Sequence, residues 1–267
     1  MKENTKVLRL VESALLLALA AVLSLVKLLD LPYGGSITAC SALPLLLIAY
    51  RHGLGYGLFA GTAYALIQLL LGMNNLSYFT TPLSVVAVIL LDYLLAFAVL
   101  GLGGIFRRGR SQGQALVLGG LLTGLLRYLF HVIAGCTVWA GLSIPDSAAL
   151  VYSLAYNATY MVPEVLVTVL GAWYFSRAVD VQGARPARVV KADGTKRSLL
   201  SLAAAGVAVA ALVADVVLVF AHLQDGETGD FVITGLGEVN WIAVTAVTAV
   251  GAALAALLEF LSRRRGQ

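Results

Sequence analysis

Long apolar stretches alternate with short polar segments along the whole chain. Polar residues divide it into eight apolar segments, at residues 8–29, 37–50, 54–72, 82–104, 114–140, 149–176, 198–222 and 239–262. Most approach or exceed the ~20 residues that a helix needs to cross a bilayer, whereas the second is short enough to be tilted or partly re-entrant. Lipid cannot satisfy open backbone groups, and no alternating pattern indicates a barrel. The pattern therefore predicts an all-α integral membrane protein.

The polar connections predict how these helices are grouped. The one evident linker, residues 179–197, is charged and contains glycine and proline. We therefore expect a six-helix membrane domain at 1–178, a basic cytoplasmic linker at 179–197 and a two-helix membrane extension at 198–267.

Composition and charge support this interpretation. Hydrophobic residues make up 60% of the 267 positions and charged residues only 12%, against about 25% charged in an average soluble domain. This excludes a cytosolic enzyme, a disordered chain and a nucleic-acid-binding domain. Apart from Lys27 and Arg127, every Lys and Arg lies at a terminus or in alternate connections. The positive-inside bias then predicts eight spans with both termini in the cytoplasm and basic loops that contact anionic lipid.

Ionisable residues inside the apolar segments are costly and therefore informative. They are Glu12, Asp92, Arg127, His131, Glu164 and Asp215. Glu12 is near enough to a helix end to reach the membrane surface, and Asp215 has no obvious partner. Cys40 and Cys136 lie in apolar sequence, so we expect small buried residues rather than a disulfide or metal site.

Three of the polar residues are predicted to share one depth. At 1.5 Å per residue, Asp92 lies about 15 Å, His131 about 13 Å and Asn157 about 12 Å from the outer ends of their segments. The coincidence suggests a pocket that opens outward, among the aromatic residues Tyr93, Tyr128, Trp139, Tyr152, Tyr156 and Tyr160. A carboxylate among aromatic faces suits a cation, and an imidazole with an amide can hydrogen-bond a flat heterocycle.

A purely structural interpretation is equally open from spacing alone. Asp92 could pair with Arg127, and the tyrosines could form an interfacial belt. Arg127 is expected to neutralise either Asp92 or Glu164.

No pattern typical of an enzyme is present. The sequence has no Gly-rich phosphate loop, no paired metal-ligand spacing and no G-x-S-x-G motif, so we predict neither catalytic residues, nor a metal, nor a cofactor. An ATP-driven pump would need its ATPase on another chain. Ala14 and Ala18, four residues apart on the first helix, have the small-residue spacing that lets membrane helices approach closely.

The first 180 or so residues resemble the thiamine-specific substrate-binding subunit of energy-coupling factor (ECF) vitamin transporters. The likeness lies in a His-x-x-x-Gly-x-x-x-Trp pattern ending at Trp139, a Tyr-Ser-Leu-x-x-Asn pattern ending at Asn157, and the stretches 32–38 and 90–93. It implies a six-helix unit in a bacterial cell membrane that captures thiamine from outside. It also implies a transmembrane coupling protein, carrying two ATPase subunits, that docks on Ala14 and Ala18.

The resemblance assigns ligand contacts residue by residue. By position, the binding residues would be Asp92, Tyr93, His131, Trp139, Tyr152 and Asn157. Gly35 stands where some relatives carry a Trp that stacks on the ligand, and Tyr78 or Phe79 could supply that aromatic ring. The two-helix extension is not part of the family's core.

The sequence therefore predicts the substrate-capture subunit of an ECF-type thiamine transporter. Two alternatives stay open. The same kind of subunit could take a thiamine precursor or another vitamin, or the chain could be a stand-alone secondary transporter in which acidic residues relay protons.

Overall fold

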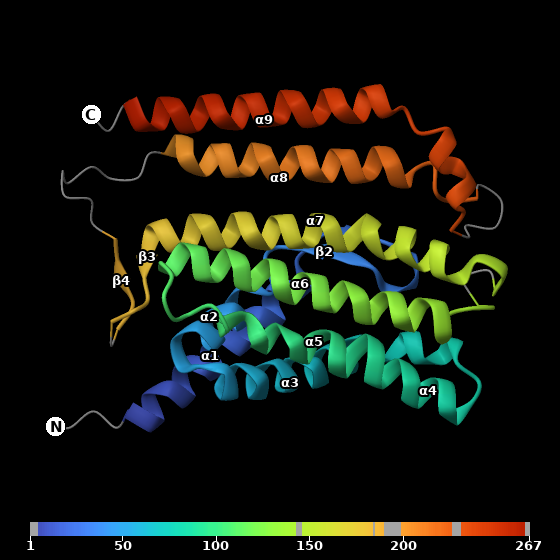
Figure 1. Cartoon of the computed structure of the whole chain (residues 1–267), viewed down its shortest axis with the longest axis horizontal. Helices are drawn as coiled ribbons and strands as arrows, with labels where there is room; N and C mark the ends of the chain where they lie inside the picture. Colours follow the sequence, from blue (N-terminus) through green and yellow to red (C-terminus); the bar gives the residue numbers. More distant parts are fainter. Residues whose placement is uncertain (1–4, 143–145, 184, 190–198, 226–230, 265–267) are drawn as a thin grey trace. The chain divides into compact units, whose positions relative to one another are not determined.

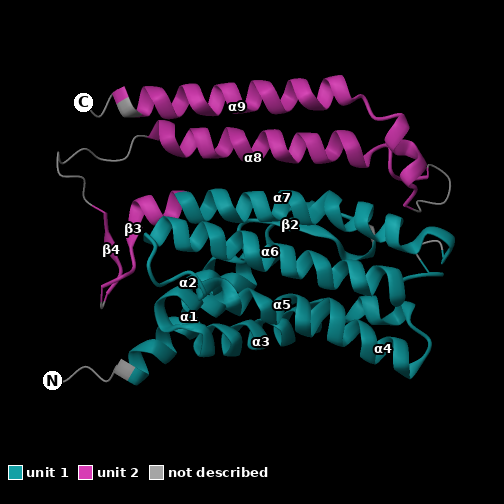
Figure 2. Ribbon diagram, viewed as in Figure 1, with its two compact units in different colours: residues 1–173 teal, residues 174–267 magenta. Residues whose placement is uncertain are grey.

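The computed structural model describes residues 5–142, 146–183, 185–189, 199–225 and 231–264. The chain forms two compact units, residues 1–173 and 174–267 (Figure 2), whereas the sequence placed the domain boundary at residue 178. Seven helical stretches of the described residues are long and apolar enough to cross a membrane. The predicted all-α integral membrane class is thus confirmed.

Unit 1 consists of short helical pieces and long helices around one small hairpin (Figure 1). Its elements before the fourth span are α1 (Thr5–Leu25), β1 (Lys27–Asp30), η1 (Pro32–Gly34), β2 (Ser36–Thr38), α2 (Leu43–His52), α3 (Leu54–Leu71) and η2 (Met73–Tyr78). The rest are α4 (Pro82–Val88), η3 (Ile89–Leu95), α5 (Ala96–Ala98), η4 (Val99–Gly104), α6 (Gln112–Thr137), η5 (Asp146–Ala148) and α7 (Ala149–Ala178), whose last residues belong to unit 2.

The segment predicted as the second span, 37–50, is not a membrane-crossing helix. It holds the end of β2, which pairs antiparallel with β1, and then α2 of only 10 residues, or about 15 Å. Arg51 at the end of α2 donates from Nη2 to Glu12 Oε2 of α1 at 3.0 Å. The hairpin and α2 together therefore return the chain to the end where α1 begins. Glu12, which the sequence places near enough to a helix end to reach the membrane surface, forms an ion pair with Arg51.

The fourth span, Pro82–Gly104, changes its helical form along its length. Thr81 caps it by accepting a hydrogen bond from the backbone N–H of Ser84 at 3.2 Å, and Pro82 occupies the first turn. After α4 the backbone widens into the π-helical η3, which contains Asp92. Wide π turns inside helices often occur at functional sites because they redirect side chains.

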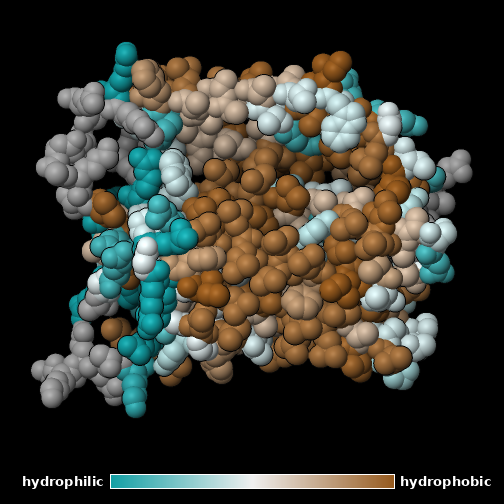
Figure 3. Space-filling model, viewed as in Figure 1, coloured by the Kyte–Doolittle hydropathy of each residue, from teal (hydrophilic) through white to brown (hydrophobic). Residues whose placement is uncertain are grey.

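The core of unit 1 lies where α2, α3 and the fourth span meet. Tyr64 of α3 and Phe97 of α5 pack edge to face with ring centroids 5.6 Å apart, beside Ala20 of α1 and Leu45 of α2. Outside this core the helices present apolar side chains to lipid: Leu83, for example, is 79% exposed. Figure 3 shows these apolar side chains covering the unit 1 helices.

Unit 2 contains β3 (Val179–Asp180), β4 (Ala187–Arg188), α8 (Leu199–Phe220), η6 (Ile233–Gly237) and α9 (Trp241–Arg264). The helices α8 and α9 lie side by side (Figure 1) and approach closely where Gly251 faces Ala211. Thr248 Oγ1 donates to Asp215 Oδ2 at 2.7 Å, so Asp215 has the partner that the sequence did not reveal.

The expectation of buried cysteines is wrong. Cys40 and Cys136 are both half-buried free thiols. Cys40 Sγ donates to the Val167 carbonyl of α7 at 3.3 Å, and Cys136 Sγ donates to the Ile133 carbonyl one turn earlier on α6 at 3.5 Å. Apolar sequence around a cysteine does not say how far its side chain is exposed. Much of the predicted linker, at 190–197, lies outside the described residues.

Candidate ligand-binding site

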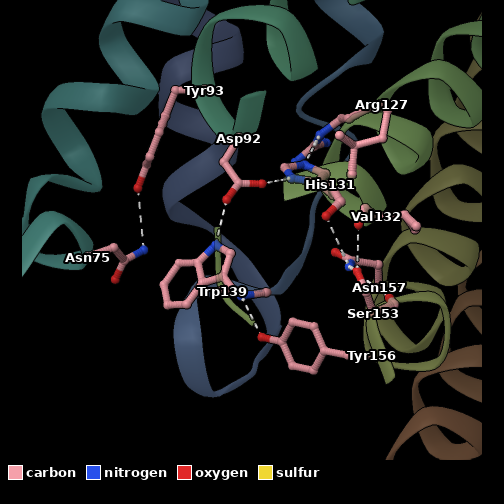
Figure 4. A network of polar contacts seen from close by, with 12 residues as sticks. Asn75, Asp92, Tyr93, Arg127, His131, Val132, Trp139, Ser153, Tyr156 and Asn157 are labelled. Carbon is pink, nitrogen blue, oxygen red and sulfur yellow. Dashed lines mark hydrogen bonds and ion pairs between the residues drawn. The ribbon is translucent and has the colours of Figure 1, made fainter. Parts of the chain in front are cut away.

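Asp92 is held by two donors from another helix and its following loop (Figure 4). Its Oδ1 lies 2.8 Å from Nδ1 of His131 on α6, and its Oδ2 accepts from Nε1 of Trp139, just after α6, at 2.7 Å. The Asp92 side chain is 15% exposed, so it faces the protein interior rather than lipid. The π-helical turn of η3 carries the carboxylate to this position.

Arg127 contacts His131 rather than a carboxylate. One helical turn before His131, it donates from Nε to His131 Nε2 at 3.3 Å, and its guanidinium lies 4.3 Å from the centre of the Phe97 ring. Within the described parts of the chain, Arg127 forms no ion pair. Of its two predicted partners, Asp92 is separated from Arg127 by His131, whereas Glu164 lines the same small cavity as Arg127 without forming a salt bridge.

Asn157 on α7 contacts the backbone beside His131. Its Nδ2 donates to the His131 carbonyl at 3.3 Å and to the Ser153 carbonyl at 2.9 Å, while its Oδ1 accepts from the Tyr160 hydroxyl at 2.6 Å. Ser153 adds a hydrogen bond from Oγ to the Val132 carbonyl at 2.8 Å. These bonds fix α7 against α6 at the level of the imidazole (Figure 4).

Aromatic rings from three segments gather around Trp139. Its ring centroid lies 4.7 Å from that of Phe79, 5.8 Å from Tyr78 and 6.3 Å from Tyr33. Tyr152 of α7 packs against the same cluster. The two aromatic residues proposed from sequence, Tyr78 and Phe79, are thus both present beside the indole.

Tyr93 points away from this group. Its hydroxyl donates to the Gly72 carbonyl at 3.0 Å and accepts from Asn75 at 3.4 Å, and its ring belongs to the core of unit 1. Figure 4 shows the Tyr93 side chain directed toward Asn75, while Asp92 next to it points to His131 and Trp139.

The first hairpin brings Tyr33, which the sequence reasoning missed. Tyr33 has φ 62°, and the following Gly34 has φ 95°, a turn that places the tyrosine ring beside Trp139. The signals were the pair of glycines after Tyr33 and its place in the stretch 32–38, which carries part of the family likeness. At Gly35 a side chain would collide with Tyr160, since a Cβ would lie 2.8 Å from that ring. The backbone N–H of Gly35 donates to the Tyr156 hydroxyl at 3.3 Å.

Comparison with known proteins identifies the relatives of unit 1. The family model described as "Thiamine transporter protein" matches residues 10–181, well over half of the chain. The chain belongs to this family. The resemblance seen in the sequence is thus confirmed, and the thiamine transporter family makes the chain a multi-pass membrane transport protein, not an enzyme.

Individual members of the family are similar to this chain over most of their own length. A protein named thiamine transporter ThiT from Bacillus subtilis is 34% identical over 179 residues, 62% of this chain and 89% of the relative. Another protein of that name, from Lacticaseibacillus paracasei, is 23% identical over 64% of this chain and 87% of its own length. The solved structure of ThiT from Listeria monocytogenes has the same fold, with a TM-score of 0.52, 24% identity, and 65% and 95% of the two chains covered. The family match ends before α8.

Proposed function

We propose that this chain captures thiamine from the outside of the cell for uptake, as the substrate-binding subunit of an ECF-type transporter. The observation that carries the proposal is the Asp92 carboxylate, held in the protein interior by His131 and Trp139 beside a cluster of aromatic rings. The names of the relatives point to the same ligand.

Charge is the first argument for thiamine. The thiazolium ring of thiamine has a permanent positive charge but no strong hydrogen-bond donor of its own, so it needs a countercharge and aromatic faces. Asp92 supplies the countercharge, and Trp139 and Tyr33 supply faces close to it. Tyr93, whose side chain is directed to Gly72 and Asn75, makes no direct ligand contact in the proposal.

Hydrogen bonding is the second argument. The aminopyrimidine of thiamine presents donors and acceptors along one flat edge, which imidazole, hydroxyl and amide groups can match. In the proposal, Tyr152 and Asn157 recognise this edge, and His131, whose two ring nitrogens contact Asp92 and Arg127, holds the acid beside it. They lie on α6 and α7, which the bonds of Ser153 and Asn157 hold in register.

The docking surface for the coupling protein is proposed to lie on α1. Ala14 and Ala18 are exposed on one side of this helix, whereas Ala20 on the other side is buried in the core. A face of small side chains lets another membrane helix approach closely. In the proposal, the coupling protein docks there and two ATPase subunits bound to it drive release of thiamine to the inside.

The Asp92→Asn variant tests the proposed ligand contact. The carboxamide keeps the shape of the side chain but removes its charge, so we expect thiamine affinity to fall at least about tenfold, or roughly 1.4 kcal/mol, in calorimetric titration of purified protein. Asp146→Asn, the same change at an exposed acid of η5, is the control and should bind as wild type. Unchanged affinity in Asp92→Asn would remove the proposed role of the acid.

Competition with the uncharged pyrimidine half of thiamine separates the ligands. If thiamine is the ligand, the pyrimidine alone should compete only weakly with thiamine for the wild-type protein. In Asp92→Asn the difference between the affinities for thiamine and for the pyrimidine should become smaller. A subunit specific for a precursor would bind the pyrimidine as tightly as thiamine and would not respond to the loss of charge.

A further inference from the structure

The hydrogen bond from Arg127 to His131 determines where the imidazole carries its proton. A guanidinium can only donate, so His131 Nε2 must present a lone pair to Arg127 Nε, 3.3 Å away. The single ring proton of a neutral imidazole then resides on Nδ1. From there it is donated to Asp92 Oδ1 at 2.8 Å.

The surroundings of His131 also oppose a second proton. A proton on Nε2 would meet the Nε–H of Arg127 and would place a positive charge beside the guanidinium. The other groups that face the imidazole are Asp92 of η3, Phe97 of α5 and Tyr160 of α7, whose ring centroid lies 6.0 Å away. Of the described residues in contact, only Asp92 favours the charged form.

Arg127 itself has a countercharge on its far side. Arg127 and the fully buried Glu164 both line a cavity of about 10 Å³, about the size of one water molecule. Both oxygens of Glu164 accept hydrogen bonds from Thr38, at 2.6 and 2.7 Å, as expected of an ionised carboxylate. Glu164 can thus balance Arg127, which leaves the charge of Asp92 uncompensated.

We propose that Arg127 is a positioning residue that holds His131 neutral, with its proton on Nδ1, so that Asp92 keeps its negative charge for a cationic ligand. If His131 became positively charged, it would neutralise Asp92 and remove the countercharge. The consequence for thiamine rests on the function proposed above, whereas the state of His131 does not.

Nitrogen NMR of the histidines in purified, ligand-free protein tests the assignment directly. The chain has three histidines, so single substitutions of His52 and His222 identify the His131 signals. At about pH 6, where an ordinary histidine is largely charged, wild-type His131 should be neutral with the proton on Nδ1. A charged ring, or a proton on Nε2, would overturn the proposal without any variant.

The double variant Arg127→Gln/Glu164→Gln removes one positive and one negative charge, so the net charge around His131 stays the same. We expect its His131 to be charged at about pH 6, whereas Glu164→Gln alone, which keeps Arg127, should give the wild-type spectrum. A neutral ring with its proton on Nδ1 in the double variant would overturn the role of Arg127. The wild-type spectrum keeps the proposal falsifiable if the double variant fails to fold.

Thiamine titration at two pH values adds the functional consequence. Between about pH 7.5 and about pH 5.5 a histidine with an ordinary pKa of about 6.5 changes its neutral fraction about tenfold. The double variant should therefore lose at least about tenfold in affinity over this range and wild type less than about twofold. Equal losses in both proteins would contradict the proposal. If the wild-type spectrum is as expected but thiamine does not bind, the proposed function fails and the assignment of His131 stands.

Discussion

At the scale of single residues, Trp139 has two separable properties. Its N–H donates to Asp92, and its ring is the centre of the aromatic cluster. Trp139→Phe keeps an aromatic ring but removes the donor, and a hydrogen bond to a charged group contributes about 1.5–3 kcal/mol. Because Asp92 then loses one of its two fixed partners, we expect thiamine affinity to fall about tenfold by titration.

The matched control for this change lies in unit 2. Trp241 also donates its N–H to a carbonyl, that of Leu236 at 3.2 Å, but it is exposed and lies outside the site. Trp241→Phe should leave thiamine affinity unchanged. Equal affinity of Trp139→Phe and wild type would mean that the indole N–H has no part in binding.

The sequence predicted these residues better than it predicted their partners. Depth alone grouped Asp92, His131 and Asn157, because the rise per residue of a helix is nearly constant. It could not tell whether Asp92 faces Arg127 or His131, which lie on the same stripe of α6 and differ by one turn. The π-helical turn of η3 helps to settle this choice, and nothing in the residues around Asp92 signals such a turn.

At the scale of elements, Glu164 joins α7 to the first hairpin. It accepts from the backbone N–H and the hydroxyl of Thr38, at the end of β2. In Glu164→Ala the buried backbone N–H of Thr38 loses its acceptor, which costs about 1–3 kcal/mol, while the Thr38 hydroxyl keeps Ser41 Oγ at 2.8 Å as a partner. We therefore expect Glu164→Ala to lower the Tm of the purified protein clearly and Thr38→Val, which removes only the hydroxyl, to lower it less.

An exposed acid provides the comparison. Glu238, after η6, is exposed, and Glu238→Ala should leave the Tm within the error of the measurement. If Glu164→Ala were as stable as this control, Glu164 would not hold the hairpin in place. The sequence had marked Glu164 only as a costly charge in need of a partner.

The hairpin itself shows what apolar patterns leave out. Residues 37–50 are apolar enough for a span, but Ser36, Thr38 and Ser41 precede a proline at the start of α2, and Cys40 has φ 62°. These residues end a strand and turn the chain before a helix can form. Long apolar segments predicted the long helices well, because in lipid the helix is the form that satisfies the backbone locally.

At the scale of the whole molecule, the family match covers most of unit 1 and ends early in unit 2. The family model ends at residue 181, and every residue proposed to bind ligand lies in unit 1. Unit 2 has internal polar bonds of its own, such as Arg177 to Glu259 at 3.1 Å. The charged linker marked where the last two long helices begin, but the segment counted as the second of six spans is not a membrane-crossing helix.

The proposed docking to a coupling protein can be tested on the whole molecule, because thiamine binding and thiamine uptake are measured separately. Ala14→Trp together with Ala18→Trp fills the exposed small-residue face of α1 while leaving Asp92, His131 and Trp139 untouched. We expect the purified variant to bind thiamine within about twofold of wild type, and cells that contain the coupling protein and its ATPases to lose thiamine uptake.

A second pair of substitutions controls for bulk in the membrane. Leu121 and Leu125 have the same spacing on the exposed side of α6, so Leu121→Trp/Leu125→Trp adds comparable indole area elsewhere and should keep uptake. Retained uptake in the Ala14/Ala18 variant would show that α1 does not carry the docking face. Uptake that depends on a proton gradient in vesicles without any ATPase would instead favour a self-sufficient transporter, because an ECF subunit has no energy source of its own.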